Sequence, residues 1–461
     1  MKDLTKGNIY KTFFFFGLPL VLSGLLTQTY SVIDTAIAGR FLGEKALAAM
    51  GAIAPLNTFF NSIFWGYGVG FSVYLGGLFS AKKYDKIRES VSSNVLLMSV
   101  VCIVLSVLAI VFYKPIFRLL KVDESLWEMA FAYFSIIMAG KLLFTLNSAG
   151  VYVMNAFGIS GFPFITSILS AVLNVTGNIL SITILGWGIE GVALSTVFAS
   201  LIVDVCYFFK FHKCLKEMGA EKKGKSFSWQ PIKKSFPYAV PNMLQQGVMY
   251  FFSLGISPLV NSLGPSGSAS YSVVSQVYNI NTAVYYNSAR CISCYAAQCV
   301  GKKEYGKIKK GILTGLIQNV AFTTPFILAC VFFAEPICNI FLKADADLLT
   351  KEYAYMFARE YVPFLYIDLL CNLFHGLYRG TKATAALFST SCLGAVSRFA
   401  YSFALMPSMQ MRGFYLAWVL SWVTETIYTL IVYARGRWNP AWQELRGEKL
   451  RRQQAENQSA E

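Results

Sequence analysis

The run VSSNVLLMSVVCIVLSVLAIVFY, residues 91–113, contains no charged side chain. At a rise of about 1.5 Å per residue, a helix of this length crosses the hydrocarbon core of a bilayer, which is about 30 Å thick. Residues 13–33 and 311–333 have the same uncharged, apolar character. Because lipid offers no partner to a free backbone N–H or C=O, such runs have to be helical.

The composition of the whole chain agrees with these runs. Of its 461 residues, 55% are hydrophobic and only 14% are charged, whereas a soluble domain carries about 25% charged residues. The pattern predicts an all-α integral membrane protein with about twelve transmembrane helices. The expected spans are 13–37, 46–72, 90–112, 131–154, 163–184, 189–210, 237–260, 269–298, 311–333, 353–378, 384–405 and 412–434.

The twelve spans fall into two groups of six. A shift of about 221 residues brings Tyr84 onto Tyr305 and Asp204 onto Glu425, which indicates an internal repeat. We therefore expect a six-helix lobe at 1–217, a cytoplasmic linker at 218–234, a second six-helix lobe at 235–435 and a basic cytoplasmic tail at 436–461. A substrate path between two pseudo-symmetric halves would follow from this organisation.

The net charge of +16 raises the question of a nucleic-acid partner. Most of the basic residues lie in alternate loops, as the positive-inside rule requires of a membrane protein. This distribution favours a multi-pass protein of the inner (plasma) membrane with both termini in the cytoplasm. It argues against nucleic acid, and leaves the lipid bilayer and a small-molecule substrate as the expected partners of a monomer.

No enzyme motif is found in the sequence. It has no HExxH and no nucleophile elbow, and the loop that begins at Gly301-Lys302-Lys303 has Ile308 where a P-loop needs Ser or Thr. The Cys291-x-x-Cys294 pair resembles a redox or metal motif by spacing alone, but buried cysteines commonly pack as small apolar residues. We expect a protein that is not an enzyme and holds no cofactor or metal.

Several separated motifs carry a family resemblance. They are Val32 to Gly39 with Leu42-Gly43 and Ala46 to Ala49; Leu173-Asn174-x-x-x-Asn178 with Gly188-x-x-Gly191; Asp368 with Arg379-Gly380; and Ala297 to Lys303. Together they resemble the multidrug and toxic compound extrusion (MATE) family of the MOP superfamily. The resemblance covers roughly residues 10–435 and implies a two-lobed efflux transporter.

The candidate ion-coupling residues of the first half are Asp34, Asn174 and Asn178. Asp34 lies in an apolar helix, where an ionised carboxylate is costly and a protonatable one is useful. The alternative is that Asp34 caps the helix near Arg40. The resemblance implies that Asn174 and Asn178 hydrogen-bond Asp34. Acidic members of the family have Asp in the position of Asn178, so coupling through two carboxylates is in doubt here.

The second half offers candidates for substrate or ion binding. Asp368, Cys371, Asn372 and His375 recur at three, four and seven residues and so share one face of a predicted helix. A carboxylate and an imidazole two turns apart could relay protons or bind an ammonium group, although His375 could equally be a structural hydrogen-bonding residue. Gln245 and Gln246 stand where sodium-coupled relatives carry a glutamate, and Gln276 is a further polar candidate.

Two more charges, Arg398 and Glu425, fall within adjacent predicted spans. An unpaired ion at that depth costs several kcal/mol, so we expect the two to pair with each other.

The function expected from these features is a secondary active antiporter. It would export amphipathic or cationic organic solutes, such as drugs and toxins, in exchange for protons or sodium ions. The sequence does not decide between these two coupling ions. The alternative is a flippase for a lipid-linked glycan of the same superfamily, for which buried cations such as Lys141, Arg290 and Arg398 would face phosphate. A major-facilitator transporter fits less well, because the loop at 80–88 lacks that family's Gly-x-x-x-Asp-Arg pattern.

Overall fold

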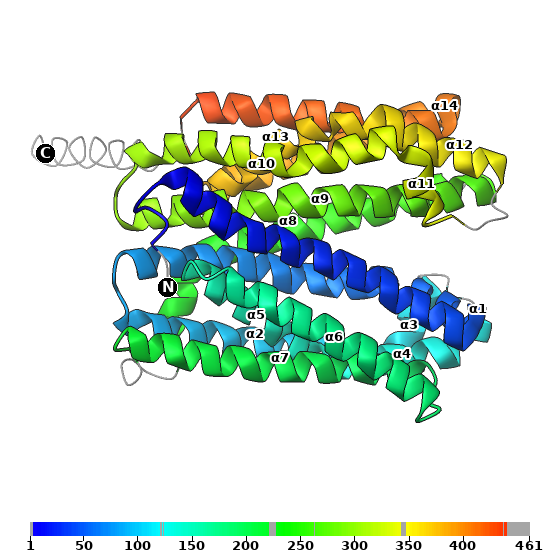
Figure 1. The fold of residues 1–461 in the computed structure, drawn as a ribbon, viewed down its shortest axis with the longest axis horizontal. Helices are drawn as coiled ribbons and strands as arrows, with labels where there is room; N and C mark the ends of the chain where they lie inside the picture. Colours follow the sequence, from blue (N-terminus) through cyan, green and yellow to red (C-terminus); the bar gives the residue numbers. More distant parts are fainter. Residues whose placement is uncertain are drawn as a thin grey trace, which may run out of the picture. The chain divides into compact units, whose positions relative to one another are not determined.

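The computed structural model describes residues 3–119, 122, 124–220, 227–261, 263–342, 347–436 and 438–439. These residues form helices and their connections, and contain no strand (Figure 1). The chain divides into two compact units. The first unit comprises residues 18–239, and the second comprises residues 3–17 together with 240–461.

The first unit is built from the helices of the N-terminal half. They are most of α1 (Ile9–Ser80), α2 (Asp85–Val111), α3 (Tyr113–Leu119), the 3₁₀ turn η1 (Glu124–Leu126), α4 (Trp127–Ala139), α5 (Lys141–Ala156), α6 (Gly161–Thr183), α7 (Ile189–Glu217) and the start of α8 (Trp229–Asn261). The segment from η1 through α4 and the helix α5 meet at an angle of 47° and together form one broken apolar span.

The second unit takes up the rest of α8 and the following helices. They are α9 (Gly264–Gly301), α10 (Gly306–Phe332), α11 (Ala334–Asn339), α12 (Leu348–Met356), the π turn η2 (Phe357–Tyr361), the 3₁₀ turn η3 (Val362–Phe364), α13 (Leu365–Gly380) and α14 (Thr384–Ala434). The long α14 breaks at Gln410, whose φ of 50° is not helical. We call residues 384–409 its first arm and 411–434 its second arm.

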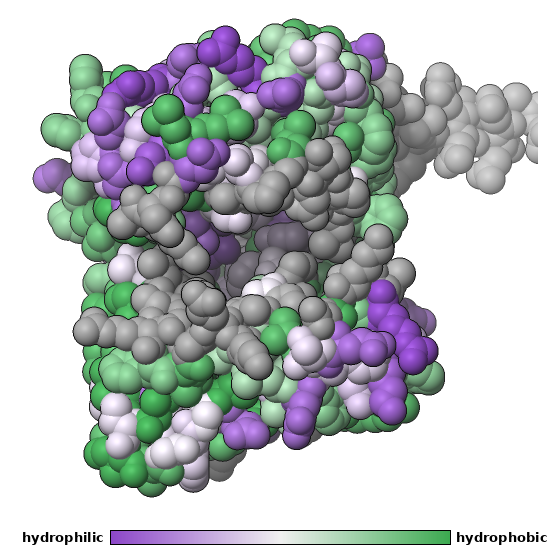
Figure 2. Space-filling view, turned by 90° about the vertical axis from the view of Figure 1, so that its right-hand side faces the viewer, coloured by the Kyte–Doolittle hydropathy of each residue, from purple (hydrophilic) through white to green (hydrophobic). Residues whose placement is uncertain are grey.

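Among the residues that the structure describes, seven segments are long and apolar enough to cross a membrane, and the bent pair at η1–α4 and α5 makes an eighth. Two of the seven lie within α1, at Ile9–Tyr30 and Leu56–Ser80. The break at Gln410 divides α14 into two spans. The more polar α8, α9 and the α12–α13 pair complete the predicted twelve, so the predicted all-helical membrane fold is confirmed. Figure 2 looks onto helix ends and shows hydrophilic side chains exposed there beside apolar ones.

The N-terminal segment is tied into the second unit. The backbone N–H of Leu4 donates to Oε1 of Gln298 over 2.8 Å, and the Lys302 ammonium pairs with the Asp3 carboxylate. Burial raises the pKa of Asp3, but hydrogen bonds from Lys302 and Thr5 lower it, and its net pKa lies below the usual 3.8. The predicted division at 217–235 therefore describes the chain order, whereas residues 3–17 pack with the second half.

Small residues let α13 lie close against α9. A Cβ atom at Gly376 would come within 2.6 Å of the Ala289 carbonyl oxygen, and one at Gly380 within 2.6 Å of the Ser293 carbonyl oxygen. This Gly-x-x-x-Gly spacing places both glycines on one face of α13 and permits near contact of the two backbones. Because α9 and α13 both carry polar side chains, their close approach assembles the polar core of the second unit.

Candidate functional site

A chain of buried amides runs through the first unit where α6 packs on α7. Asn178 Nδ2 donates to Asn174 Oδ1 over 3.1 Å, and Asn174 Nδ2 donates to the Thr196 hydroxyl over 2.8 Å. Both asparagines are essentially inaccessible to solvent. Asn174 and Asn178 lie one helical turn apart, so a single face of α6 carries both amides. The side chain of Asp34, their predicted partner, lies outside the described residues, although its backbone belongs to α1.

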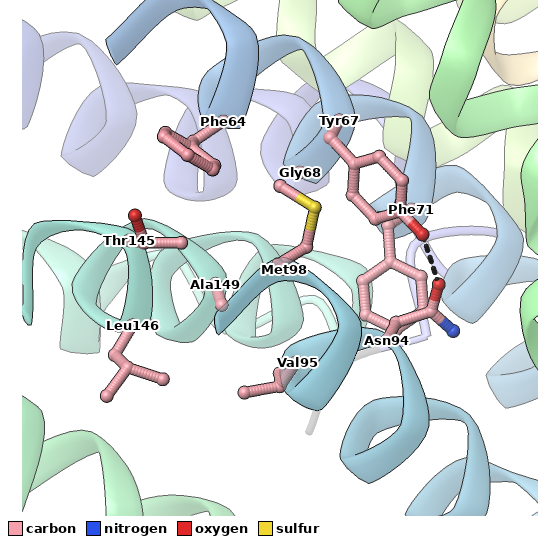
Figure 3. A pocket seen from close by; sticks show the side chains of 10 residues that line it. All are labelled: Phe64, Tyr67, Gly68, Phe71, Asn94, Val95, Met98, Thr145, Leu146 and Ala149. Carbon is pink, nitrogen blue, oxygen red and sulfur yellow. Dashed lines mark hydrogen bonds between the residues drawn. The ribbon is translucent and has the colours of Figure 1, made fainter. Parts of the chain in front are cut away.

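A small cavity lies elsewhere in the first unit, among α1, α2 and α5 (Figure 3). Phe64, Tyr67 and Phe71 form one wall, and Tyr67 donates to Asn94 Oδ1 over 2.6 Å at its polar end. About 20 Å³ is open to the centres of water molecules, which is room for about one water. A drug-sized ligand needs a pocket of about 300–1,000 Å³, so this cavity is not a solute site in the described conformation.

Lys141 is the buried cation of the first unit. Its side chain is fully enclosed at the start of α5, and the ammonium nitrogen lies 5.8 Å from the centre of the Phe144 ring. Within the described part of the chain Lys141 forms no ion pair. A buried ammonium that lies near a ring and has no ion pair among the described residues is a natural partner for an anionic group.

The carboxyl group of Asp368 is the centre of a hydrogen-bond cluster in the second unit. Tyr285 and Tyr278 of α9 donate to Oδ2, the latter over 3.4 Å, and Asn372 Nδ2 donates to Oδ1 over 3.0 Å. Asp368 is only 6% exposed. All three partners are donors, so the carboxyl accepts on both oxygens. The sequence predicted Asp368 and Asn372 from their spacing and offered both tyrosines only as aromatic faces for a cation. Their hydrogen bonds to Asp368, which lies more than 80 residues away in the chain, were not predicted.

His375 lies one turn beyond Cys371 on the same helix. Its Nε2 is 2.9 Å from the Thr390 hydroxyl, 3.6 Å from Cys371 Sγ and 3.6 Å from Glu425 Oε1. The predicted polar face of α13 therefore continues onto both arms of α14. Glu425, which we expected to pair with Arg398, belongs to the same buried cluster.

The expected Arg398–Glu425 ion pair is not formed, and this prediction was wrong. Arg398 Nε donates to the Ser421 hydroxyl over 3.3 Å, and the guanidinium lies over the rings of Trp418 and Trp422 at 5.4 and 6.0 Å. The ring faces of two tryptophans attract the cation by their quadrupoles. Arg398 therefore interacts with Glu425 only through the longer-range electrostatic field.

The glutamines divide into two groups. Gln245 Nε2 donates to the Ser391 hydroxyl over 2.6 Å, and Gln245 Oε1 accepts from Arg379 over 3.4 Å. Gln246 and Gln276 are half-buried on α8 and α9. Among the described residues, neither makes a hydrogen bond to the Asp368 cluster.

Comparison with known proteins identifies the family. The MatE family model matches residues 19–180 and 241–404, one segment in each half. The chain belongs to the MATE family of membrane transporters. The two matches include every candidate site residue predicted from the sequence, but Glu425 lies beyond the second match. Members of the MATE family are transporters.

Curated relatives of this MATE chain differ in what they are named for. Two are from Bacillus subtilis. The probable multidrug resistance protein YoeA is 25% identical to this chain over 75% of this chain and 76% of its own length. The probable multidrug resistance protein YpnP is 24% identical over 95% of this chain and 97% of its own length. An FAD transporter from Shewanella oneidensis is 23% identical over 76% of this chain and 78% of its own length.

Solved structures confirm the MATE fold. An outward-facing multidrug resistance MATE transporter of the MOP superfamily superposes with a TM-score of 0.84 at 15% identity, covering 96% of this chain and 99% of the other. A MOP superfamily transporter from Pyrococcus furiosus, described as having a binding pocket of reverse polarity, superposes with a TM-score of 0.81 at 16% identity over 95% and 97%.

Proposed function

We propose that the chain is a secondary active antiporter that exports amphipathic or cationic organic solutes in exchange for protons or sodium ions. The family membership and the two relatives named for multidrug resistance support export of such solutes. The observation that carries the proposal is Asp368, a buried carboxyl group that two tyrosine side chains and one asparagine side chain contact. A carboxylate beside aromatic faces is suited to a lipophilic cation.

The first half is proposed to couple the ion gradient. Asp34 would take up and release the ion, and the Asn174–Asn178 chain would orient it through hydrogen bonds. In the second half, Asp368, Asn372 and His375 would bind solute or ion, with Gln245, Gln246 and Gln276 as further polar contacts. Alternation between inward-open and outward-open states would then exchange solute for ion.

We place the transporter in the plasma membrane as a monomer, with both termini on the cytoplasmic side. The support is the concentration of Lys and Arg in alternate loops, of which Lys82, Lys83, Lys302 and Lys303 are examples.

A second candidate is transport of an anionic cargo, including a lipid-linked glycan carrying phosphate. The specific observation in its favour is Lys141, a fully enclosed cation without an ion pair among the described residues. One relative is named as an FAD transporter, and FAD carries phosphate groups. Lys141→Met would abolish anion transport and leave cation efflux intact if this candidate is correct.

Proteoliposomes test both candidates. The purified chain is reconstituted, a proton or a sodium gradient is imposed separately, and a fluorescent lipophilic cation is compared with FAD and a lipid-linked glycan. We expect cation movement driven by one of the two gradients. Movement of FAD or glycan alone would support the second candidate, and movement without any imposed gradient would contradict antiport.

The variant Asp34→Asn tests the proposed coupling residue. Asparagine keeps the volume and hydrogen-bonding capacity of Asp34 but cannot exchange a proton or carry a charge. The expected variant folds and binds solute but no longer accumulates it against a gradient. Wild-type efflux by a well-folded Asp34→Asn protein would return Asp34 to a helix-capping role.

A further inference from the structure

Three metal-binding side chains meet inside the second unit. Cys371 and His375 lie one turn apart on α13, and Glu425 reaches them from the second arm of α14. The Sγ and Oε1 atoms each lie 3.6 Å from His375 Nε2, and the three atoms all lie within 4.8 Å of one another. Within the described part of the chain no other three cysteine, histidine or acidic residues meet in this way.

The spacing of these atoms fits a tetrahedral metal ion. Zinc lies about 2.3 Å from a thiolate sulfur and about 2.0–2.1 Å from an imidazole nitrogen or carboxylate oxygen. In a tetrahedron those bond lengths place the ligand atoms roughly 3.3–3.6 Å apart. The observed separations around His375 Nε2 therefore need little adjustment. The residue set, one thiolate, one imidazole and one carboxylate, suits a borderline divalent ion more than Mg²⁺ or Ca²⁺.

The charges of the three ligands also balance a divalent ion. A thiolate and a carboxylate carry two negative charges between them, and the imidazole is neutral when it binds metal. The bound cluster would then be neutral, which matters at a site enclosed within apolar helices.

The first arm of α14, which lies opposite Glu425, leaves room for the Glu425 carboxylate. A Cβ atom at Gly394 on the first arm of α14 would collide with both carboxylate oxygens of Glu425. The lack of a side chain at position 394 therefore keeps the carboxylate beside His375. The Thr390 hydroxyl, 2.9 Å from His375 Nε2, and the Thr429 hydroxyl, 3.6 Å from Cys371 Sγ, lie beside the ligand atoms as further oxygen donors.

We propose that Cys371, His375 and Glu425 form a binding site for a borderline divalent metal ion such as Zn²⁺. Binding joins α13 to the second arm of α14, and the ion takes over the hydrogen bond between His375 and Thr390. The thiol proton leaves to solvent as the metal–sulfur bond forms. The site shares His375 with the proposed solute- or ion-binding set, whereas none of the three residues takes part in the hydrogen bonds to Asp368.

Cobalt spectroscopy of the purified full-length chain tests this site. The protein is stripped with a chelator, reduced, and titrated with Co²⁺, which takes zinc sites and gives coloured complexes. We expect a thiolate-to-cobalt charge-transfer band in the near ultraviolet and intense tetrahedral bands in the visible, both removed by added Zn²⁺. Cys371→Ser should lose the charge-transfer band, and Glu425→Gln should weaken Co²⁺ binding about tenfold or more.

The chain supplies matched controls. It has only two histidines, and the other, His212, is exposed on α7. His212→Gln and Cys294→Ser should therefore keep the wild-type spectrum, whereas His375→Gln should not. Zn²⁺ should also raise the thermal unfolding midpoint of the wild type and not that of Cys371→Ala.

Two results would overturn the proposal. One is the lack of a charge-transfer band in folded wild-type protein, which would leave His375 and Glu425 as a hydrogen-bonded pair. The other is an unchanged band in both Cys371→Ser and Cys371→Ala, which would assign the metal to another thiol.

Discussion

Removing the Asp368 carboxyl should leave a buried donor without an acceptor. In Asp368→Ala, the buried hydroxyl of Tyr285 loses its hydrogen bond, whereas the half-buried amide of Asn372 keeps its bond to the backbone carbonyl of residue 368 over 3.0 Å. An unsatisfied buried donor costs about 1–3 kcal/mol of unfolding free energy, and the variant should lose roughly that amount. The Tyr278 contact, at 3.4 Å, is too long to add much.

Tyr285→Phe tests the same interaction from the other side. It removes one hydrogen bond to a carboxyl group. That bond is worth about 1.5–3 kcal/mol if the carboxyl is ionised, and about 0.6 kcal/mol if it behaves like the average hydrogen bond between membrane helices. In the double variant the tyrosine donor is no longer stranded. The double variant should therefore be more stable than the sum of the single losses predicts, by about 1–3 kcal/mol.

The assay is reversible unfolding in mixed detergent micelles, followed by tryptophan fluorescence. Tyr271→Phe is the matched control, because Tyr271 lies on the same helix and packs on Phe414 without contacting Asp368. The unfolding free energy lost in Tyr271→Phe should add to that lost in Asp368→Ala within about 0.5 kcal/mol. A coupling below about 0.5 kcal/mol for the Tyr285 pair would refute the view that Asp368 organises the polar core.

Three further predictions concern packing, pH and topology. Gly376→Ala should lower the thermal midpoint, since overpacking costs about 1–3 kcal/mol, whereas Gly247→Ala, which meets nothing within 4 Å, should not. The pKa of Asp3 is depressed, so its ion pair with Lys302 stabilises the folded N-terminal segment above the unfolded pKa and is lost as pH falls through the folded pKa. A spin label on residue 6 should therefore become mobile below pH 3.8, and Asp3→Asn should remove that pH dependence. A cysteine at exposed Lys82 should resist an impermeant thiol reagent in intact cells, and labelling there would reverse the proposed orientation.

Periodicity and charge were enough to predict the fold, because a membrane span is a local property of about 20 consecutive residues. The predicted spans at 384–405 and 412–434 match the two arms of α14, with Pro407 and Gln410 at the break between them. The repeat and the basic loops added the two-lobed organisation. The assignment of residues 3–17 to the second unit was not predictable, since it depends on side-chain contacts nearly 300 residues apart.

The candidate site could be predicted only where it lies on one helix. The spacing of Asp368, Asn372 and His375 predicted a shared face of α13. The partners on other helices, Tyr285 and Glu425, could not be chosen from the many tyrosines and the few acids of the chain without a structure. Arg398 shows the same limit, because a charge count suggests a carboxylate partner and cannot foresee that two tryptophan rings receive the cation.

The bond between Leu4 and Gln298 has a consequence for biosynthesis. These residues are separated by 294 positions in the chain, so Leu4 leaves the ribosome well before its partner does. At a synthesis rate of about 5–20 residues per second, that delay is on the order of 15–60 seconds. During this interval the start of α1 has neither α9 nor α10 to pack on. The contact between the segment at residues 3–17 and α9 therefore forms only after the whole of the first unit, which ends at residue 239, has been synthesised.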